Sequence, residues 1–92
     1  MKKVVRKVKV KNALGLHARP ATIIAKMLQG CKSQVAICYR KETINARSIM
    51  SILMLAVKKN SQLILEVEGE DAEETMEKLI NAFETQFGEE IL

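Results

Sequence analysis

The chain is poor in several residue types on which common functional sites depend. Its 92 residues contain no tryptophan, one tyrosine and two phenylalanines. Proteins that bind single-stranded nucleic acid stack bases on aromatic side chains, and this chain has too few of them for such a platform. It also has only two cysteines and one histidine, which supply neither a disulfide framework nor a four-ligand zinc site. We therefore expect no metal site, no cofactor and no nucleic-acid partner.

Long apolar runs are missing as well. No segment approaches the ~20 apolar residues of a membrane span, and residues 1–7 (MKKVVRK) lack the apolar core of a signal peptide. These features predict a cytoplasmic protein without a membrane partner. Hydrophobic residues nevertheless make up 48% of the chain, which favours a folded globule, and the length fits one domain over residues 1–92.

Charge is divided unevenly along the chain. Residues 1–65 carry fourteen lysines and arginines but one acid, Glu42, whereas residues 66–92 carry ten acids and one base, Lys78. Many of these side chains form ordinary solvated faces. The division also predicts that residues 1–65, which include His17, present a positive surface suited to a phosphate or an acidic partner.

Hydrophobic periodicity predicts seven elements in the order βαββαβα. Alternating apolar residues indicate strands over residues 4–10, 34–40, 43–45 and 62–68. Helical spacing indicates helices over residues 18–29, from 48 to about 58, and from 72 to 87, with the apolar stripe of the last one including Phe83 and Phe87. Four half-exposed strands and three amphipathic helices predict an α+β open-faced sandwich, a four-stranded antiparallel sheet covered on one side.

His17, the single histidine, stands where a loop becomes the first helix, in Gly15-Leu16-His17-Ala18-Arg19-Pro20-Ala21. Pro20 suits a first helical turn, since its missing N–H has no partner there. The position predicts His17 at or beside the N-cap, next to unpaired N–H groups and the positive end of the helix dipole. A nucleophilic imidazole, an arginine two residues later and a helix N-terminus favour a covalently held phosphoryl group.

A second segment, Asn45-Ala46-Arg47-Ser48-Ile49-Met50, strengthens this interpretation. Together with Gly-Leu-His-Ala-Arg-Pro-Ala-Thr it resembles the two signatures of the histidine-containing phosphocarrier (HPr) family, at the family's spacing and total length. The segments 12–15, 28–30 and 53–55 resemble the nitrogen-related branch of that family more than the sugar-uptake branch.

The resemblance implies a phosphocarrier of the phosphoenolpyruvate-dependent phosphotransferase system, without enzymatic turnover of its own. His17 would accept a phosphoryl group from enzyme I, on Nδ1 as in the family, and pass it to an enzyme IIA-type acceptor, with Arg19 steadying the phosphate. Ser48 would be a regulatory site for an HPr serine kinase/phosphorylase. We expect a monomer.

Apolar residues beside the two signatures have two possible roles. The resemblance implies a partner-docking face, formed by Leu16, Ile49, Met50 and Leu53. Core packing is the alternative for each of them, because helical spacing alone cannot separate the two. A second possible function also stays open, since small basic α+β domains bind nucleic acid.

Overall fold

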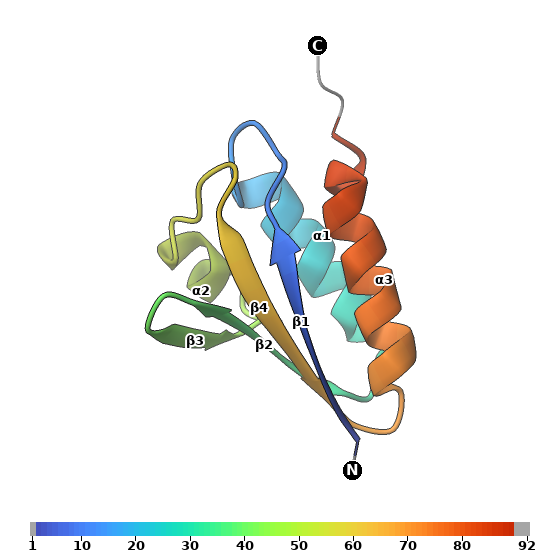
Figure 1. Cartoon of the computed structure of the whole chain (residues 1–92). Helices are drawn as coiled ribbons and strands as arrows, with labels where there is room; N and C mark the ends of the chain where they lie inside the picture. The colour runs from blue at the N-terminus through green and yellow to red at the C-terminus, as the bar shows by residue number, and fades with distance from the viewer. Residues whose placement is uncertain (1, 90–92) are drawn as a thin grey trace.

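The computed structural model describes residues 2–89 and shows a four-stranded antiparallel sheet with strand order β1-β4-β2-β3. The elements are β1 (Lys3–Lys9), α1 (Ala18–Gln29), β2 (Gln34–Tyr39), β3 (Glu42–Asn45), α2 (Ile49–Met54), β4 (Gln62–Glu68) and α3 (Ala72–Glu84), followed by a 3₁₀ turn, η1 (Gln86–Gly88) (Figure 1). The predicted βαββαβα order and the antiparallel sheet are confirmed.

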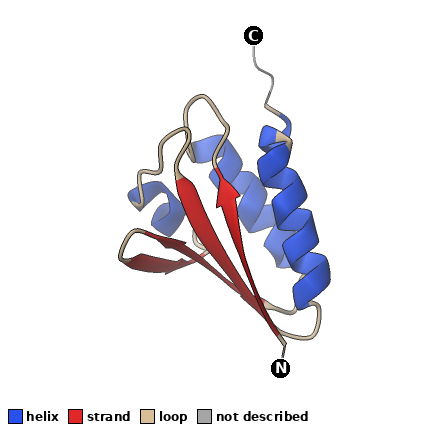
Figure 2. Cartoon of the chain, viewed as in Figure 1, coloured by secondary structure: helices blue, strands red, loops and turns tan. Residues whose placement is uncertain are grey.

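The helices cover one face of the sheet and leave the other face open (Figure 2). Alternation in β4 produces this arrangement: Leu63, Leu65 and Val67 are buried, whereas Ile64 on the opposite face is 37% exposed. Helices α1 and α3 bury apolar stripes against the same side, including Ile24, Leu28, Met76, Leu79 and Phe83. Within residues 2–89, no helix is long and apolar enough to cross a bilayer.

Helix α2 is shorter than the sequence predicts, because it ends at Met54 rather than near residue 58. The chain turns at Ala56, with φ 53°, and Val57 is buried with its carbonyl accepting from the N–H of Leu16 at 3.0 Å. Pairing with the β1–α1 loop therefore replaces helix continuation. Asn60 is left-handed, φ 72°, but it lies in the turn before β4 and ends no helix.

The last helix also ends early, at Glu84. Phe87 is buried as predicted, but it belongs to η1, where Gln86 and Phe87 have φ of 56° and 54°. The Phe87 ring packs edge-on against Phe83, with ring centroids 4.8 Å apart. The 3₁₀ turn thus ends α3, and Glu89 after it lies beside Asn12 of the β1–α1 loop.

Asp71 ties the start of α3 to the loop after α1. Its carboxylate accepts from the backbone N–H of Lys32 at 2.9 Å and from the hydroxyl of Ser33, and it makes no cap bond to its own helix. The Lys32 N–H, and then the Ser33 hydroxyl, lower the pKa of Asp71 below its ordinary value.

The lowered pKa of Asp71 makes a prediction about acid stability. A folded-state pKa below the unfolded one gives stabilisation that is present above the unfolded pKa, about 3.9, and is lost as pH falls through the folded pKa. Asp71→Asn should therefore lower the free energy of unfolding at neutral pH, with the difference from the parent shrinking in acid. Urea titrations at neutral and acid pH measure this difference. Glu70→Gln is the control, because Glu70 makes an exposed ion pair with Lys32. An equal effect in both variants would contradict the assignment.

Candidate functional site

His17 is the N-cap of α1, as the sequence predicts. Its backbone is extended (φ −84°, ψ −167°), and its carbonyl accepts from the N–H of Ala21 at 3.1 Å. The side chain makes no cap bond and is 30% exposed. The imidazole is therefore not used to cap the helix, while the backbone of His17 is fixed by the helix start.

Gly15 sets the path of the loop that leads into His17. Its φ is +68°, and a Cβ at this position would lie 2.1 Å from the carbonyl oxygen of Val57. The next residue, Leu16, donates its N–H to that same carbonyl. Glycine is required here both by the left-handed backbone and by the close approach of residues 57 and 58.

Two residues at the imidazole were not predicted from the sequence. Glu89 contacts the ring directly, and Asn12 contacts Glu89. Glu89 places its Oε1 and Oε2 at 3.1 Å and 2.9 Å from Nε2 of His17. Asn12 donates from Nδ2 to Oε1 of Glu89 at 2.5 Å and to the carbonyl of Gln86 at 2.8 Å. No local motif connects positions separated by 72 and 77 residues. Figure 1 shows the reason they meet: the β1–α1 loop and the C-terminal end of α3 lie at the same end of the molecule.

Arg19 lies in the first turn of α1 with an exposed side chain. Pro20 follows it and is buried. The N–H groups of Ala18 and Arg19 lie in the first turn, where no preceding helical carbonyl can accept from them. These N–H groups and the guanidinium lie at the end of α1 where His17 stands. Together they can accommodate a dianion close to the imidazole.

Ser48 is the N-cap of α2, and its Oγ accepts from the N–H of Ser51 at 3.2 Å. The preceding residue, Arg47, turns away from this cap. Its Nη2 donates to the carbonyls of Leu28, Cys31 and Ser33 at 3.2, 3.1 and 2.9 Å. Arg47 therefore anchors the chain before α2 to the C-terminal end of α1, and Ser48 is half-buried.

The apolar residues predicted to dock partners do not share one environment. Ile49 and Met50 are 38% and 66% exposed at the start of α2, and Leu53 is half-buried against the core. Leu16 is 2% exposed, so its predicted docking role is corrected to core packing: pairing with Val57 turns it inward. Leu14, at 75% exposure, is the apolar side chain that this loop presents to solvent.

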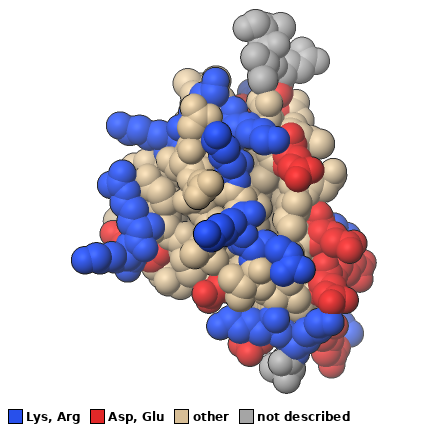
Figure 3. All heavy atoms as spheres, viewed as in Figure 1, with Lys and Arg blue, Asp and Glu red and all other residues tan. Residues whose placement is uncertain are grey.

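Charge on the surface follows the division seen in the sequence. In Figure 3, lysines and arginines gather over the strands, whereas acids lie along the edge formed by α3. Strand β1 carries Lys3, Arg6, Lys7 and Lys9, and α3 carries Glu73, Glu74, Glu77 and Glu84. The two signs are thus separated between a basic sheet face and an acidic helix.

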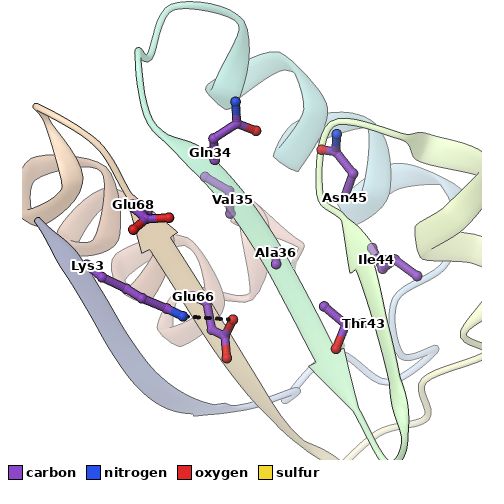
Figure 4. A pocket seen from close by; sticks show the side chains of 9 residues that line it. All are labelled: Lys3, Gln34, Val35, Ala36, Thr43, Ile44, Asn45, Glu66 and Glu68. Atoms are coloured by element: carbon purple, nitrogen blue, oxygen red, sulfur yellow. Dashed lines mark ion pairs between the residues drawn. The ribbon is translucent and has the colours of Figure 1, made fainter. Parts of the chain in front are cut away.

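A shallow hollow on the open face of the sheet lies between β1 and β4 on one side and β2 and β3 on the other (Figure 4). Lys3 and Glu66 form an ion pair at its rim, 3.7 Å from Nζ to Oε1. None of the predicted site residues lines this hollow. Among residues 2–89, no cluster of three or more histidine, cysteine, aspartate or glutamate side chains could hold a metal ion.

Comparison with known proteins points to one family. The family model described as "PTS HPr component phosphorylation site" matches residues 4–85. The phosphocarrier protein HPr of Chlamydia trachomatis is 39% identical over 80 residues, which are 87% of this chain and 73% of that protein. The crystal structure of HPr-C-His from Thermoanaerobacter tengcongensis superposes with a TM-score of 0.89 at 37% identity, covering 99% of this chain and 100% of that one. HPr from Bacillus anthracis gives a TM-score of 0.83 at 34% identity, covering 88% and 96%.

Proposed function

Because the chain belongs to the HPr family of phosphocarriers in the phosphotransferase system, we propose that His17 is the residue that carries its phosphoryl group. Members of this family are carriers and not enzymes. One observation supports the proposal above the others: His17 is a partly exposed N-cap whose side chain caps nothing. Its ring therefore lies beside the positive end of α1 without being used to cap the helix.

The chemistry of a carrier requires a bond that forms and breaks readily. Neutral imidazole is a good nucleophile near pH 7, and its N–P bond is labile. After transfer, the new dianion meets the N–H groups at the start of α1 and the Arg19 guanidinium. Stabilisation by an exposed arginine and a helix end is moderate, which suits a phosphoryl group that must be released again.

The proposed partners are enzyme I as donor and an enzyme IIA-type protein as acceptor, in a cytoplasmic relay served by a monomer. The exposed apolar side chains of Ile49 and Met50, with Leu53 beside them, support a docking face on α2. Helix α2 packs against α1, which brings this face to the helix that carries His17. The basic surface of β1 supports electrostatic attraction of an acidic partner.

Incubation with phosphoenolpyruvate and enzyme I tests the proposal. A phosphohistidine gives an adduct that is labile in acid and stable in base, and the parent should form it in a single equivalent. Failure to form any adduct would contradict the proposal. A mobility shift with DNA or RNA, weakened by salt, would instead support the alternative of a basic nucleic-acid-binding domain.

Arg19→Ala should slow phosphoryl transfer through His17 about tenfold or more, since a charge-assisted hydrogen bond to phosphate contributes about 1–3 kcal/mol. The melting temperature should change little, because the Arg19 side chain is exposed. Arg19→Lys should restore the rate only in part, since it lacks the planar fork of the guanidinium. Rapid-quench transfer kinetics measure the effect, with Lys26→Ala on the same helix as the charge-matched control. Equal rates in Arg19→Ala and Lys26→Ala would remove the proposed role.

A further inference from the structure

The imidazole of His17 is held on one side by a carboxylate from the far end of the described chain. Both oxygens of Glu89 lie within hydrogen-bond distance of Nε2. An ionised carboxylate can only accept hydrogen bonds, so the ring nitrogen that faces it must carry the proton. In a neutral ring the other nitrogen, Nδ1, then keeps its lone pair.

From this geometry we propose that Glu89 is a positioning residue, which holds His17 with its proton on Nε2 and with Nδ1 free to attack phosphorus. The inference rests on the proposed function of His17. During transfer, the Nδ1 lone pair forms the bond to phosphorus while the bond from phosphorus to the donor breaks, and that electron pair leaves with the donor. The ring keeps its Nε2 proton and gains positive charge, which the Glu89 carboxylate stabilises through the same hydrogen bond.

Asn12 fixes Glu89 in place. Its side-chain N–H groups go to Oε1 of Glu89 and to the carbonyl of Gln86. The opposite orientation of the amide would set Oδ1 against two oxygens, so these acceptors determine which way the amide points. Asn12 thus links the loop before His17 to the turn that carries Glu89.

The burial of Asn12 shows that this link forms away from solvent. The residue is 1% exposed, and its Oδ1 has no hydrogen-bond partner among residues 2–89. The role of this asparagine is therefore to donate two hydrogen bonds, one of which holds the Glu89 carboxylate against His17.

The turn η1 brings Glu89 to this position. The positive φ values of Gln86 and Phe87 end the helical path of α3 and turn the chain away from it. Phe87 is anchored on Phe83, and the N–H of Glu89 donates to the carbonyl of Gln86 at 2.9 Å. The same carbonyl accepts from Asn12, which also donates to the Glu89 carboxylate. The backbone and the side chain of Glu89 are therefore both fixed beside Asn12.

Imidazole ¹⁵N NMR tests the proposal without any transfer reaction. His17 is the only histidine, so its ring signals need no assignment. In alkaline buffer the parent should show one tautomer, protonated on Nε2, with a hydrogen-bonded Nε2 proton shifted downfield. In Glu89→Gln that proton should move upfield and the Nδ1-protonated tautomer should appear, because an amide can accept from or donate to the ring. An unchanged spectrum in Glu89→Gln would overturn the proposal.

Transfer kinetics with enzyme I give the second readout. Glu89→Gln should reduce kcat about tenfold with an unchanged KM for this protein, since one charge-assisted hydrogen bond to the reacting ring is weakened and docking is not. Glu89→Asp should recover part of the rate, and Asn12→Ala should shift the tautomers in the same direction as Glu89→Gln. Glu84→Gln is the matched control, because it makes the same charge change at an exposed position at the end of α3.

Two results would contradict the positioning role in different ways. Faster transfer in Glu89→Gln would mean that the carboxylate blocks the incoming phosphate. An equal fall in kcat for Glu84→Gln would mean that net charge alone matters. If the parent forms no phosphohistidine, the function proposed for His17 fails, whereas the tautomer measurement still decides whether Glu89 orients the ring.

Discussion

His17→Ala is expected to abolish labelling of the chain from phosphoenolpyruvate while leaving the fold intact. No second histidine exists to accept the phosphoryl group. The lost side chain is 30% exposed and caps nothing, and its hydrogen bonds within residues 2–89 go to Glu89. The melting temperature should therefore stay close to that of the parent, as for most substitutions outside the core. Intact-mass spectrometry after incubation with enzyme I measures the labelling, and circular dichroism measures the fold.

The stability of any adduct in acid and base separates this outcome from labelling elsewhere. Phosphoserine, for instance at Ser48, survives acid, whereas phosphohistidine does not. An acid-labile adduct on His17→Ala would therefore disprove the assignment of the acceptor. An unfolded His17→Ala protein would be equally informative, because it would show that the imidazole is structural, contrary to its exposure.

The order of the elements and one helix could be predicted from sequence because local features determine them. The strand that became β4 alternates apolar residues over its length, and α1 has the predicted bounds because Pro20 and Gly30 mark its two ends. The ends of the other two helices could not be predicted in this way. Their apolar spacing continues beyond the helix, while a tertiary contact stops it: Val57 with Leu16 after α2, and Phe87 with Phe83 after α3.

In the candidate site, too, the local features could be predicted and the tertiary contacts could not. His17 is an N-cap as predicted, and Ser48 stands where the sequence predicts a helix to begin, because helix starts are set by local features. Glu89 and Asn12 were missed because their contact depends on the β1–α1 loop and the segment after α3 lying at the same end of the molecule. The burial of Leu16 likewise depends on a backbone partner 41 positions later in the chain, Val57. What the sequence could not supply is thus the set of long-range partners around the histidine.

Ser48→Asp is expected to fold normally and to accept phosphate from enzyme I about tenfold more slowly than the parent at low salt, as an added charge at a docking face reduces association. The Oγ of Ser48 accepts a hydrogen bond from the N–H of Ser51. Aspartate caps a helix as well as serine does. The new charge lies beside Ile49 and Met50, the exposed residues of the proposed docking face. If an acidic enzyme I binds there, repulsion reduces the rate of encounter without disturbing the structure.

The substitution Ser48→Asn separates charge from capping. Asparagine has the shape of aspartate and the same capping ability, but it carries no charge, so Ser48→Asn should transfer at the parent rate. Added salt should narrow the difference between the two variants, because about 0.1 M salt screens exposed charges beyond ~10 Å. Rapid-quench measurements of the rate of phosphoryl transfer from enzyme I, over a range of ionic strength, test both effects. If both variants are equally fast at low salt, charge at position 48 does not regulate transfer and Ser48 is a cap alone. If both are equally slow, the position is sterically sensitive, and phosphorylation of Ser48 would act through contact rather than through charge.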